Sequence, residues 1–250
     1  MLLLGPWCSF SSRATLPASN PQQIYCTLSK WDKLYHDLIL RYPKPFFSPV
    51  DMSVSGIATR VMDFDGEINH RIPLFGVGDA PLVSLKEAFA IISKAGAIDE
   101  LTLDLVHFCA YDFAEDKLSG GEDPTGLLVD EIAAIHAYTQ PSPFYVKLNA
   151  ALRSEDRAQV KPFLPYIKLM LTALYKLPTS SIHLHRGIKK TLEQLGLVGK
   201  KKIVWWGFSS CTTNVSTLSD EEFLGKSGSR TMFTITQNSG VDISQYSAVS

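Results

Sequence analysis

Cysteine is scarce in this sequence, and both long apolar runs and an excess of one charge are lacking. The four cysteines are scattered and form no CxxC pair, which excludes zinc-finger spacing and a disulfide-dense secreted scaffold. No apolar run approaches the roughly 20 residues that cross a bilayer. A net charge of −1 argues against a protein that coats a polyanion. We therefore expect a reduced intracellular protein, cytoplasmic rather than secreted, with no membrane or nucleic-acid partner.

The composition is that of a globular protein. The 250 residues, 45% of them apolar, suffice for one large domain or two small ones with a real core. The start, residues 1–7, is apolar but has no basic residue and contains a proline, so it is a weak signal peptide, and a frayed chain end is the alternative. Residues 1–23, rich in Ser, Pro and Gln, are predicted to be a disordered lead-in. Residues 24–71 are predicted to hold a helix over 24–40 and then short strands.

The middle of the chain is predicted to be helical. Ser84 and Glu87 have capping-box spacing, which predicts a helix that runs to about Lys94. A break rich in Gly and acidic residues follows at 119–124. Apolar residues at helical spacing then predict three helices, over residues 125–139, 143–153 and 158–176.

The pattern changes after Pro178. Alternating or β-branched residues predict strands over residues 182–186, 202–206 and 231–236. Helices followed by strands indicate an α+β fold, with a helical lobe packed on a β-rich core, and exclude a doubly wound α/β sheet. We assign residues 72–250 to this domain.

Three patterns of possible ligand-binding residues have simpler explanations. Residues 225–227 end like a phosphate loop, but position 220 is Asp where that motif needs glycine. His183 and His185 share one face of a strand, yet no third metal ligand lies near them in sequence, so packing or hydrogen bonding explains them better than a metal. The acidic residues at 63–67 fit a solvated turn better than a cation site. The sequence therefore predicts no metal.

Two segments of the strand-rich part carry more specific chemistry. The strand that ends in Arg186 and Gly187 offers a planar fork of donors suited to carboxylate or phosphate, and the glycine lets a ligand approach the backbone. Residues 205–214 run from two tryptophans into small hydroxyl side chains, which can place donors over a ligand. Each segment alone is also compatible with a purely structural role.

Together with the helices before them, these segments resemble the arginine-specific mono-ADP-ribosyltransferases, the R-S-E class of NAD-dependent transferases. Arg186-Gly187 resembles the first motif of that family, and Ser210-Cys211-Thr212 stands where the family has Ser-Thr-Ser. Other stretches also resemble the family, and they are residues 126–139, 145–153, 166–178 and 240–244. The resemblance covers about residues 72–250.

The resemblance implies a function and a set of residues. It implies transfer of ADP-ribose from NAD or NADP to arginine side chains of an acceptor protein, with release of nicotinamide and without a metal. Arg186 and Gly187 would bind the dinucleotide, with Thr212 as a further contact. Ser210 would orient both the dinucleotide and the catalytic carboxylate, and it is the catalytic residue that the resemblance identifies.

The third element of the family, a Glu-x-Glu pair, has no counterpart in these residues. In the family its last glutamate stabilises a transition state that resembles an oxocarbenium ion. The carboxylates after Cys211 are Asp220, Glu221, Glu222 and Asp242. Ser219 and Glu222 are spaced as a capping box, which predicts a short helix there.

Without a placed carboxylate, positive charge on the ribose has nothing to stabilise it. We therefore expect a transferase domain that is truncated before the Glu-x-Glu pair, with an open sheet edge at residues 231–235 and 243–246. The alternative function is a catalytically inactive NAD-binding or structural module.

Overall fold

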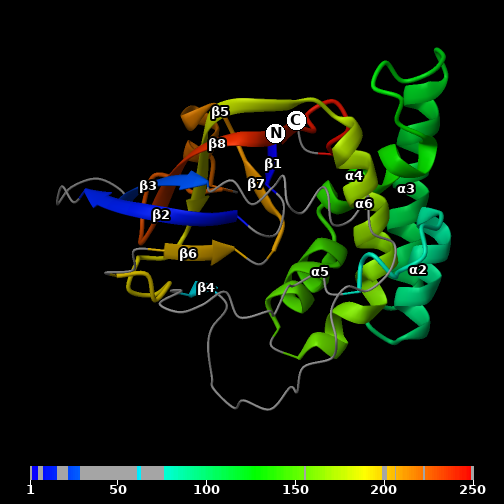
Figure 1. The fold of residues 1–250 in the computed structure, drawn as a ribbon, viewed down its shortest axis with the longest axis horizontal. Helices are drawn as coiled ribbons and strands as arrows, with labels where there is room; N and C mark the ends of the chain where they lie inside the picture. The colour runs from blue at the N-terminus through cyan, green and yellow to red at the C-terminus, as the bar shows by residue number, and fades with distance from the viewer. Residues whose placement is uncertain are drawn as a thin grey trace. The chain divides into compact units, whose positions relative to one another are not determined.

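The computed structural model describes residues 2–4, 8–15, 22–28, 61–62, 76–154, 156–198, 202–205, 207–221 and 223–248. These residues belong to two compact units (Figure 1). One unit is built on strands and contains Thr179–Val241 together with the strands that precede residue 63. The other is helical and contains the described part of Ile72–Pro178 together with residues 242–248. The protein is of the α+β class, as its sequence predicts.

The helical unit contains five α-helices and one 3₁₀ helix among its described residues. They are α2 (Leu85–Lys94), α3 (Glu100–Leu118), α4 (Val129–Thr139), α5 (Pro143–Arg153), η1 (Arg157–Phe163) and α6 (Leu164–Lys176). The predicted capping box starts α2, since the Ser84 hydroxyl accepts from the Glu87 amide at 3.2 Å and the Glu87 carboxylate accepts from the Ser84 amide at 3.0 Å. The helix predicted over 143–153 is confirmed at both ends.

Three helices differ from the sequence-based expectation, and each has a physical reason. The helix predicted over 125–139 begins only at Val129, as α4, because Gly126 has a φ of 73°, which a right-handed helix excludes. The stretch predicted as one helix over 158–176 is divided into η1 and α6, because Pro162 and Pro165 lack the amide hydrogen that a continuous α-helix needs. Helix α3 escaped prediction because apolar residues lie on its exposed side as well as its buried side. Leu101 is 81%, Leu105 65% and Phe108 68% exposed, so the pattern has no clean helical period.

Aromatic side chains form the centre of the helical unit. The ring of Phe89 lies 4.9 Å from that of Phe144 and 6.0 Å from that of Tyr166, centroid to centroid. Tyr166 is fully buried, and its hydroxyl donates to the carbonyl of Ala134 at 2.8 Å. This single bond satisfies the only polar atom of the buried side chain and ties α6 to α4.

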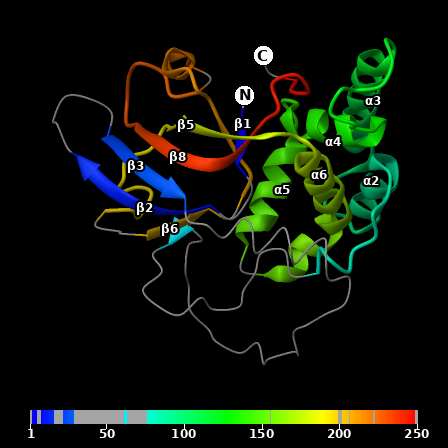
Figure 2. The ribbon, with the colours of Figure 1, turned by 45° about the horizontal axis from the view of Figure 1, so that its top comes forward.

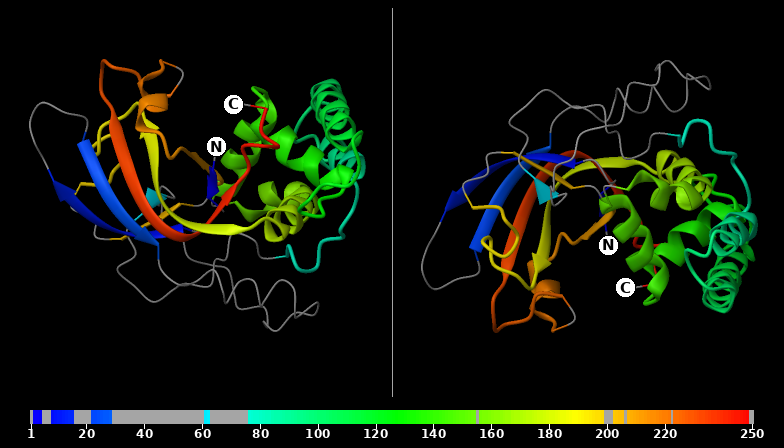
Figure 3. Two further views of the ribbon diagram at one scale, coloured as in Figure 1. Left: turned by 90° about the horizontal axis from the view of Figure 1, so that it is seen from above. Right: turned by 90° about the horizontal axis from the view of Figure 1, so that it is seen from below.

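The strand unit is one eight-stranded sheet. Its strands are β1 (Leu2–Leu4), β2 (Cys8–Thr15), β3 (Gln22–Leu28), β4 (Val61–Met62), β5 (Thr179–Ile188), β6 (Lys202–Trp205), β7 (Ser209–Cys211) and β8 (Thr231–Asp242). The order is β4-β6-β2-β3-β8-β1-β7, with β5 paired to β8. Figure 2 shows β2 and β3 beside β8, and Figure 3 shows the long antiparallel pair of β5 and β8.

The amino-terminal residues differ from their prediction. The stretch 1–23, expected to be disordered, contains β1, β2 and the start of β3, and residues 24–28 continue β3 where a helix over 24–40 was expected. The rest of that predicted helix lies outside the described residues. Strands β2 and β3 pair with each other, and each also has a partner that is distant in sequence: β2 pairs with β6, and β3 pairs with β8. No local pattern signals these two distant pairings.

Strand β8 has a neighbour on each side, so the open edge expected at residues 231–235 is wrong. Residues 22–27 of β3 run parallel to residues 231–236, and β5 runs antiparallel on the other side, with Leu184 opposite Ile235 and Arg186 opposite Phe233. Leu184, Phe233 and Ile235 are completely buried. The backbone groups of β8 are therefore paired within the sheet, which removes the template for association that an open edge presents.

Within the helical unit, the segment after β8 is held by a buried tyrosine. The hydroxyl of Tyr246 donates to both carboxylate oxygens of Asp123, at 3.0 and 2.9 Å. The carbonyl of Tyr246 lies 3.2 Å from Nδ1 of His136, and the amide of Ala248 donates to the hydroxyl of Thr139 at 2.8 Å. Four hydrogen bonds thus fix residues 246–248 against the ends of α4 and the loop before it.

The same tyrosine influences the titration of Asp123. Burial acts to raise the pKa of Asp123, but the hydrogen bonds that it accepts from Thr125 and Tyr246 outweigh burial and leave that pKa below its ordinary value. A carboxyl group with a lowered pKa contributes stability above its unfolded pKa of about 3.9. That contribution is lost as the pH falls through the lower folded value.

We expect Tyr246→Phe to lower the free energy of unfolding by about 1–3 kcal/mol at neutral pH, because the buried Asp123 carboxylate loses the hydrogen bonds from the Tyr246 hydroxyl. The variant should also lose less stability than the wild type as the pH falls below about 4, because its Asp123 pKa is less depressed. Urea unfolding from pH 7 to pH 3 measures both effects. Tyr145→Phe, at an exposed tyrosine, is the matched control. Equal stability of Tyr246→Phe and wild type would show that the tyrosine does not hold this segment.

Candidate functional site

The strand unit brings Arg186 and Ser210 together. His185 and Thr212 form an isolated antiparallel bridge, in which each amide donates to the other residue's carbonyl, at 2.7 and 2.9 Å. The bridge places the Arg186 end of β5 beside β7. There Nη1 of Arg186 donates to the carbonyl oxygen of Ser210 at 2.8 Å. The first and second motifs of the sequence, 24 positions apart, are therefore in direct contact.

The contact between the two motifs uses the backbone of Ser210. Its side chain is half-buried, and no described residue forms a hydrogen bond with its hydroxyl. The hydroxyl of Thr212 instead accepts from the amide of Asn214 at 3.0 Å. The Asn214 side chain in turn caps η2 (Val215–Ser219) by accepting from the amide of Ser216 at 3.0 Å. Arg186, Ser210 and Thr212 thus form one cluster, in which Thr212 also closes a local turn; their roles towards a dinucleotide stay predictions.

Gly187 is half-buried at the same place, and one side of it is occupied. A Cβ atom built on Gly187 would stand 2.6 Å from Cβ of Leu224. A ligand can approach this glycine only from a side other than the one that Leu224 covers. The sequence carried no signal for Leu224, which lies outside both motifs.

Cys211 is unsuited to act as a nucleophile. The residue is buried, and burial raises the pKa of its thiol to about 12, although the positive charge of Arg186 acts in the opposite direction. A thiol is nucleophilic as the thiolate, and a thiol with this pKa is protonated at neutral pH. Cys211 therefore contributes to packing behind the Arg186 cluster.

Two of the carboxylates after Cys211, those of Glu221 and Asp242, have partners in the structure. Glu221 forms an ion pair with Lys189 at 3.5 Å and accepts from the amide of Lys226 at 3.3 Å. Asp242 accepts from the amide of Ser244 at 2.9 Å. The short helix predicted to begin at Ser219 is wrong, because η2 ends at that residue. Glu222 lies outside the described residues.

The remaining candidates from the sequence are the possible metal ligands His183, His185 and the acidic residues at 63–67. His183 is exposed, and Nδ1 of His185 lies 3.2 Å from the hydroxyl of Thr234. Among the described residues no three His, Cys, Asp or Glu side chains gather closely enough to hold a metal. In the same part of the chain, no helix combines the length and the apolar character that a membrane span requires. Residues 63–67 lie outside the description.

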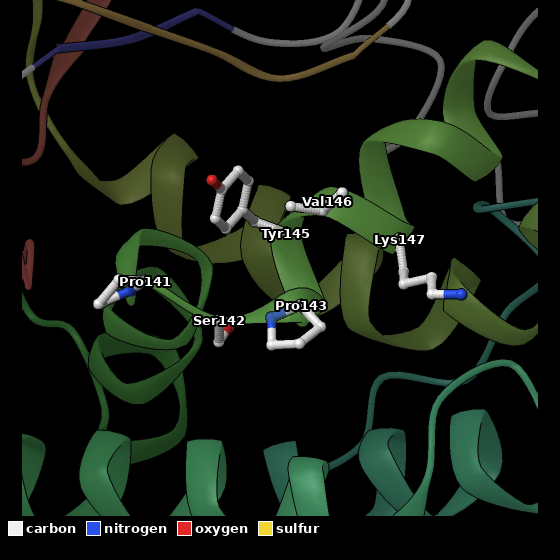
Figure 4. Close-up of a pocket in the computed structure, with 6 residues that line it drawn as sticks. All are labelled: Pro141, Ser142, Pro143, Tyr145, Val146 and Lys147. Carbon is white, nitrogen blue, oxygen red and sulfur yellow. The ribbon is translucent and has the colours of Figure 1, made fainter. Parts of the chain in front are cut away.

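An open pocket of about 450 Å³ lies in the helical unit at the start of α5 (Figure 4). Its lining residues are Pro141, Ser142, Pro143, Tyr145, Val146 and Lys147. The hydroxyl of Ser142 is buried without a hydrogen-bond partner among the described residues. The pocket is mostly apolar and carries one lysine, and none of the residues that the sequence predicted to bind the dinucleotide lines it.

Cys109 and Cys211 should differ in reactivity. We expect Cys109, which is exposed, to be alkylated by iodoacetamide in the native protein at pH 8, whereas Cys211 should react only in denaturant because its thiol is buried and protonated. Mass spectrometry of the tryptic peptides measures both. Rapid native labelling of Cys211 would show that the Arg186 cluster is open to solvent from the side of β7.

Comparisons with known proteins agree with this arrangement. The family model of NAD:arginine ADP-ribosyltransferases matches residues 112–250. The crystal structure of the eukaryotic mono-ADP-ribosyltransferase ART2.2 is similar, with a TM-score of 0.53 and 20% sequence identity over 76% of this chain and 77% of that one. A search of curated proteins found no match. The family match includes Arg186, Gly187, Ser210 and Thr212, and the structural likeness, at that identity, concerns the fold.

Proposed function

The chain belongs to the NAD:arginine ADP-ribosyltransferase family, and on that basis we propose that its β5–β7 cluster binds NAD for transfer of ADP-ribose to arginine side chains of an acceptor protein. Its family and fold are those of mono-ADP-ribosyltransferases. The specificity for arginine and the roles of individual residues belong to the proposal.

The proposed reaction exchanges one C–N bond for another. The bond between C1′ of the nicotinamide ribose and the nicotinamide nitrogen breaks, and its electron pair leaves with nicotinamide. A guanidinium nitrogen of the acceptor arginine forms the new bond to C1′ and releases one proton. Positive charge develops on the ribose before the new bond is complete, so a nearby carboxylate would lower the barrier.

The observation that carries the proposal is the hydrogen bond from Arg186 to the carbonyl of Ser210. A guanidinium has five N–H donors in a rigid plane. The carbonyl contact fixes that plane at the end of β5, next to the half-buried Ser210 side chain. A fixed planar fork suits the phosphates of a dinucleotide, because two parallel hydrogen bonds can form without reorganising the arginine.

We expect Arg186→Ala to weaken NAD binding by about tenfold or more, since a charge-assisted hydrogen bond contributes about 1.5–3 kcal/mol. Titration calorimetry on the wild type and the variant measures the difference. Arg186→Lys keeps the charge but loses the fork and should recover only part of the affinity. Lys190→Ala removes an exposed positive charge near the end of the same strand and is the matched control. Equal affinities for wild type and Arg186→Ala would overturn the assignment of Arg186.

The number and the contacts of the carboxylates after Cys211 favour a second function, which is NAD binding without transfer. No Glu-x-Glu pair follows Cys211 in these 250 residues. Glu221 is paired with Lys189, and Asp242 is held by the turn at Ser244. A carboxylate that serves such a turn is not preorganised to stabilise charge on a ribose.

The two functions predict different activities for the 250-residue chain. Loss of one electrostatic stabiliser typically costs about 10²–10³ in rate, so we expect negligible arginine-directed transfer and at most trace hydrolysis of NAD. Incorporation of labelled NAD into an arginine-rich acceptor, together with nicotinamide release, measures both reactions. If the chain is active and Glu221→Gln abolishes that activity, Glu221 is the catalytic carboxylate and the chain is a transferase as it stands.

A further inference from the structure

Gly187 has no room for a side chain, because Leu224 already fills that space. A Cβ on Gly187 would stand 2.6 Å from Cβ of Leu224, 3.0 Å from its Cδ1 and 3.1 Å from its Cγ. Leu224 is only 4% exposed. Gly187 lies in a regular strand and is not among the glycines with a positive φ angle, so packing rather than backbone conformation requires glycine here.

The segment that carries Leu224 is closed by its own hydrogen bonds and is tied to β5. The amides of Leu224 and Gly225 both donate to the carbonyl of Leu218, at 3.2 and 3.1 Å. The Glu221 carboxylate pairs with Lys189 at 3.5 Å, and Lys189 also donates to the Glu221 carbonyl. Residues 218–221 and 223–225 therefore contact Gly187 in β5 and Lys189, which directly follows β5.

We infer that the Leu224–Gly187 contact is a positioning contact for the dinucleotide site, and that it acts through Arg186. Arg186 is held on one side by the pairing of its backbone with Phe233 of β8. The residue after it is covered by Leu224. Together these contacts fix the backbone from which the guanidinium reaches Ser210. This inference rests on the proposed function, since the positioned arginine is the one that would bind NAD.

The contact also changes the role assigned to Gly187 by the sequence. From the sequence, Gly187 was expected to let a ligand approach the backbone. In the structure the space beside its Cα is used by Leu224, so the glycine serves the fit between the strand and the neighbouring loop. Gly187 and Leu224 are therefore positioning residues, and neither needs to touch the dinucleotide for its substitution to weaken binding.

The test is a set of substitutions at the two positions, with NAD affinity measured by calorimetry. Gly187→Ala should weaken NAD binding by about tenfold, the order of one lost charge-assisted hydrogen bond. Adding Leu224→Gly, which removes Cβ, should recover most of the affinity, whereas adding Leu224→Ala, which keeps Cβ at the 2.6 Å position, should not. Gly120→Ala is the control, because a Cβ there meets no atom within 4 Å.

A double-mutant cycle with Arg186→Ala separates a positioning role from a general loss of structure. If the contact acts through Arg186, then Gly187→Ala should cost less than about twofold in an Arg186→Ala background, because the arginine that it positions is absent. Independent effects would instead repeat the tenfold loss, since they add to within about twofold. Should Gly187→Ala fail to fold, Leu224→Ala in the same cycle serves instead, since it leaves the backbone of Gly187 unobstructed. Thermal unfolding of every variant checks that binding is compared between folded proteins.

Two results would overturn the inference, and they are distinguishable. If the wild type binds NAD but the effects at positions 186 and 187 are additive, or Leu224→Gly fails to rescue Gly187→Ala, the positioning role is wrong and the proposed function stands. If the folded wild type does not bind NAD at all, the proposed function fails and the positioning role fails with it.

Discussion

The antiparallel register of β5 against β8 is the constraint on which the candidate site depends. Leu184 opposite Ile235 and Arg186 opposite Phe233 set this register, and the apolar members of these pairs are completely buried. A slip by one residue would move every side chain of β5 to the opposite face. The buried Leu184 would then face the other way, so hydrophobic burial enforces the position of the neighbouring arginine.

The register alone does not bring the two motifs together. The bridge between His185 and Thr212 adds β7 beside β5, and the hydrogen bond from Arg186 to the Ser210 carbonyl then orients the guanidinium. Each step uses backbone groups that must be paired in any case when they are buried. The arrangement of the cluster is therefore a consequence of sheet formation, and the Arg186 side chain is ordered before any ligand binds.

The helical unit buries two carboxylates, those of Glu131 and Asp123. Glu131 is almost fully buried, and it accepts from Lys176 at 2.7 Å and from the Leu128 amide at 2.8 Å. Asp123 accepts from Tyr246 and Thr125 in a similar way. A buried carboxylate without partners is strongly destabilising, so each one needs donors from more than one element. These two residues connect helices and loops that the aromatic core alone would leave less precisely placed.

The sequence alone predicted the strands after Pro178, the α+β class, the family resemblance and the helices of the middle of the chain other than α3. These features depend on local spacing and on short motifs. The Ser84 capping box and the limits of α5 are examples in which neighbouring residues suffice. Other features were decided only by tertiary structure. Strands β2 and β3 pair with each other, but they join the sheet through β6 and β8 from the far end of the chain. Gly187 is required because Leu224 packs against it. Such contacts join residues with no fixed separation in sequence, so no local pattern contains them.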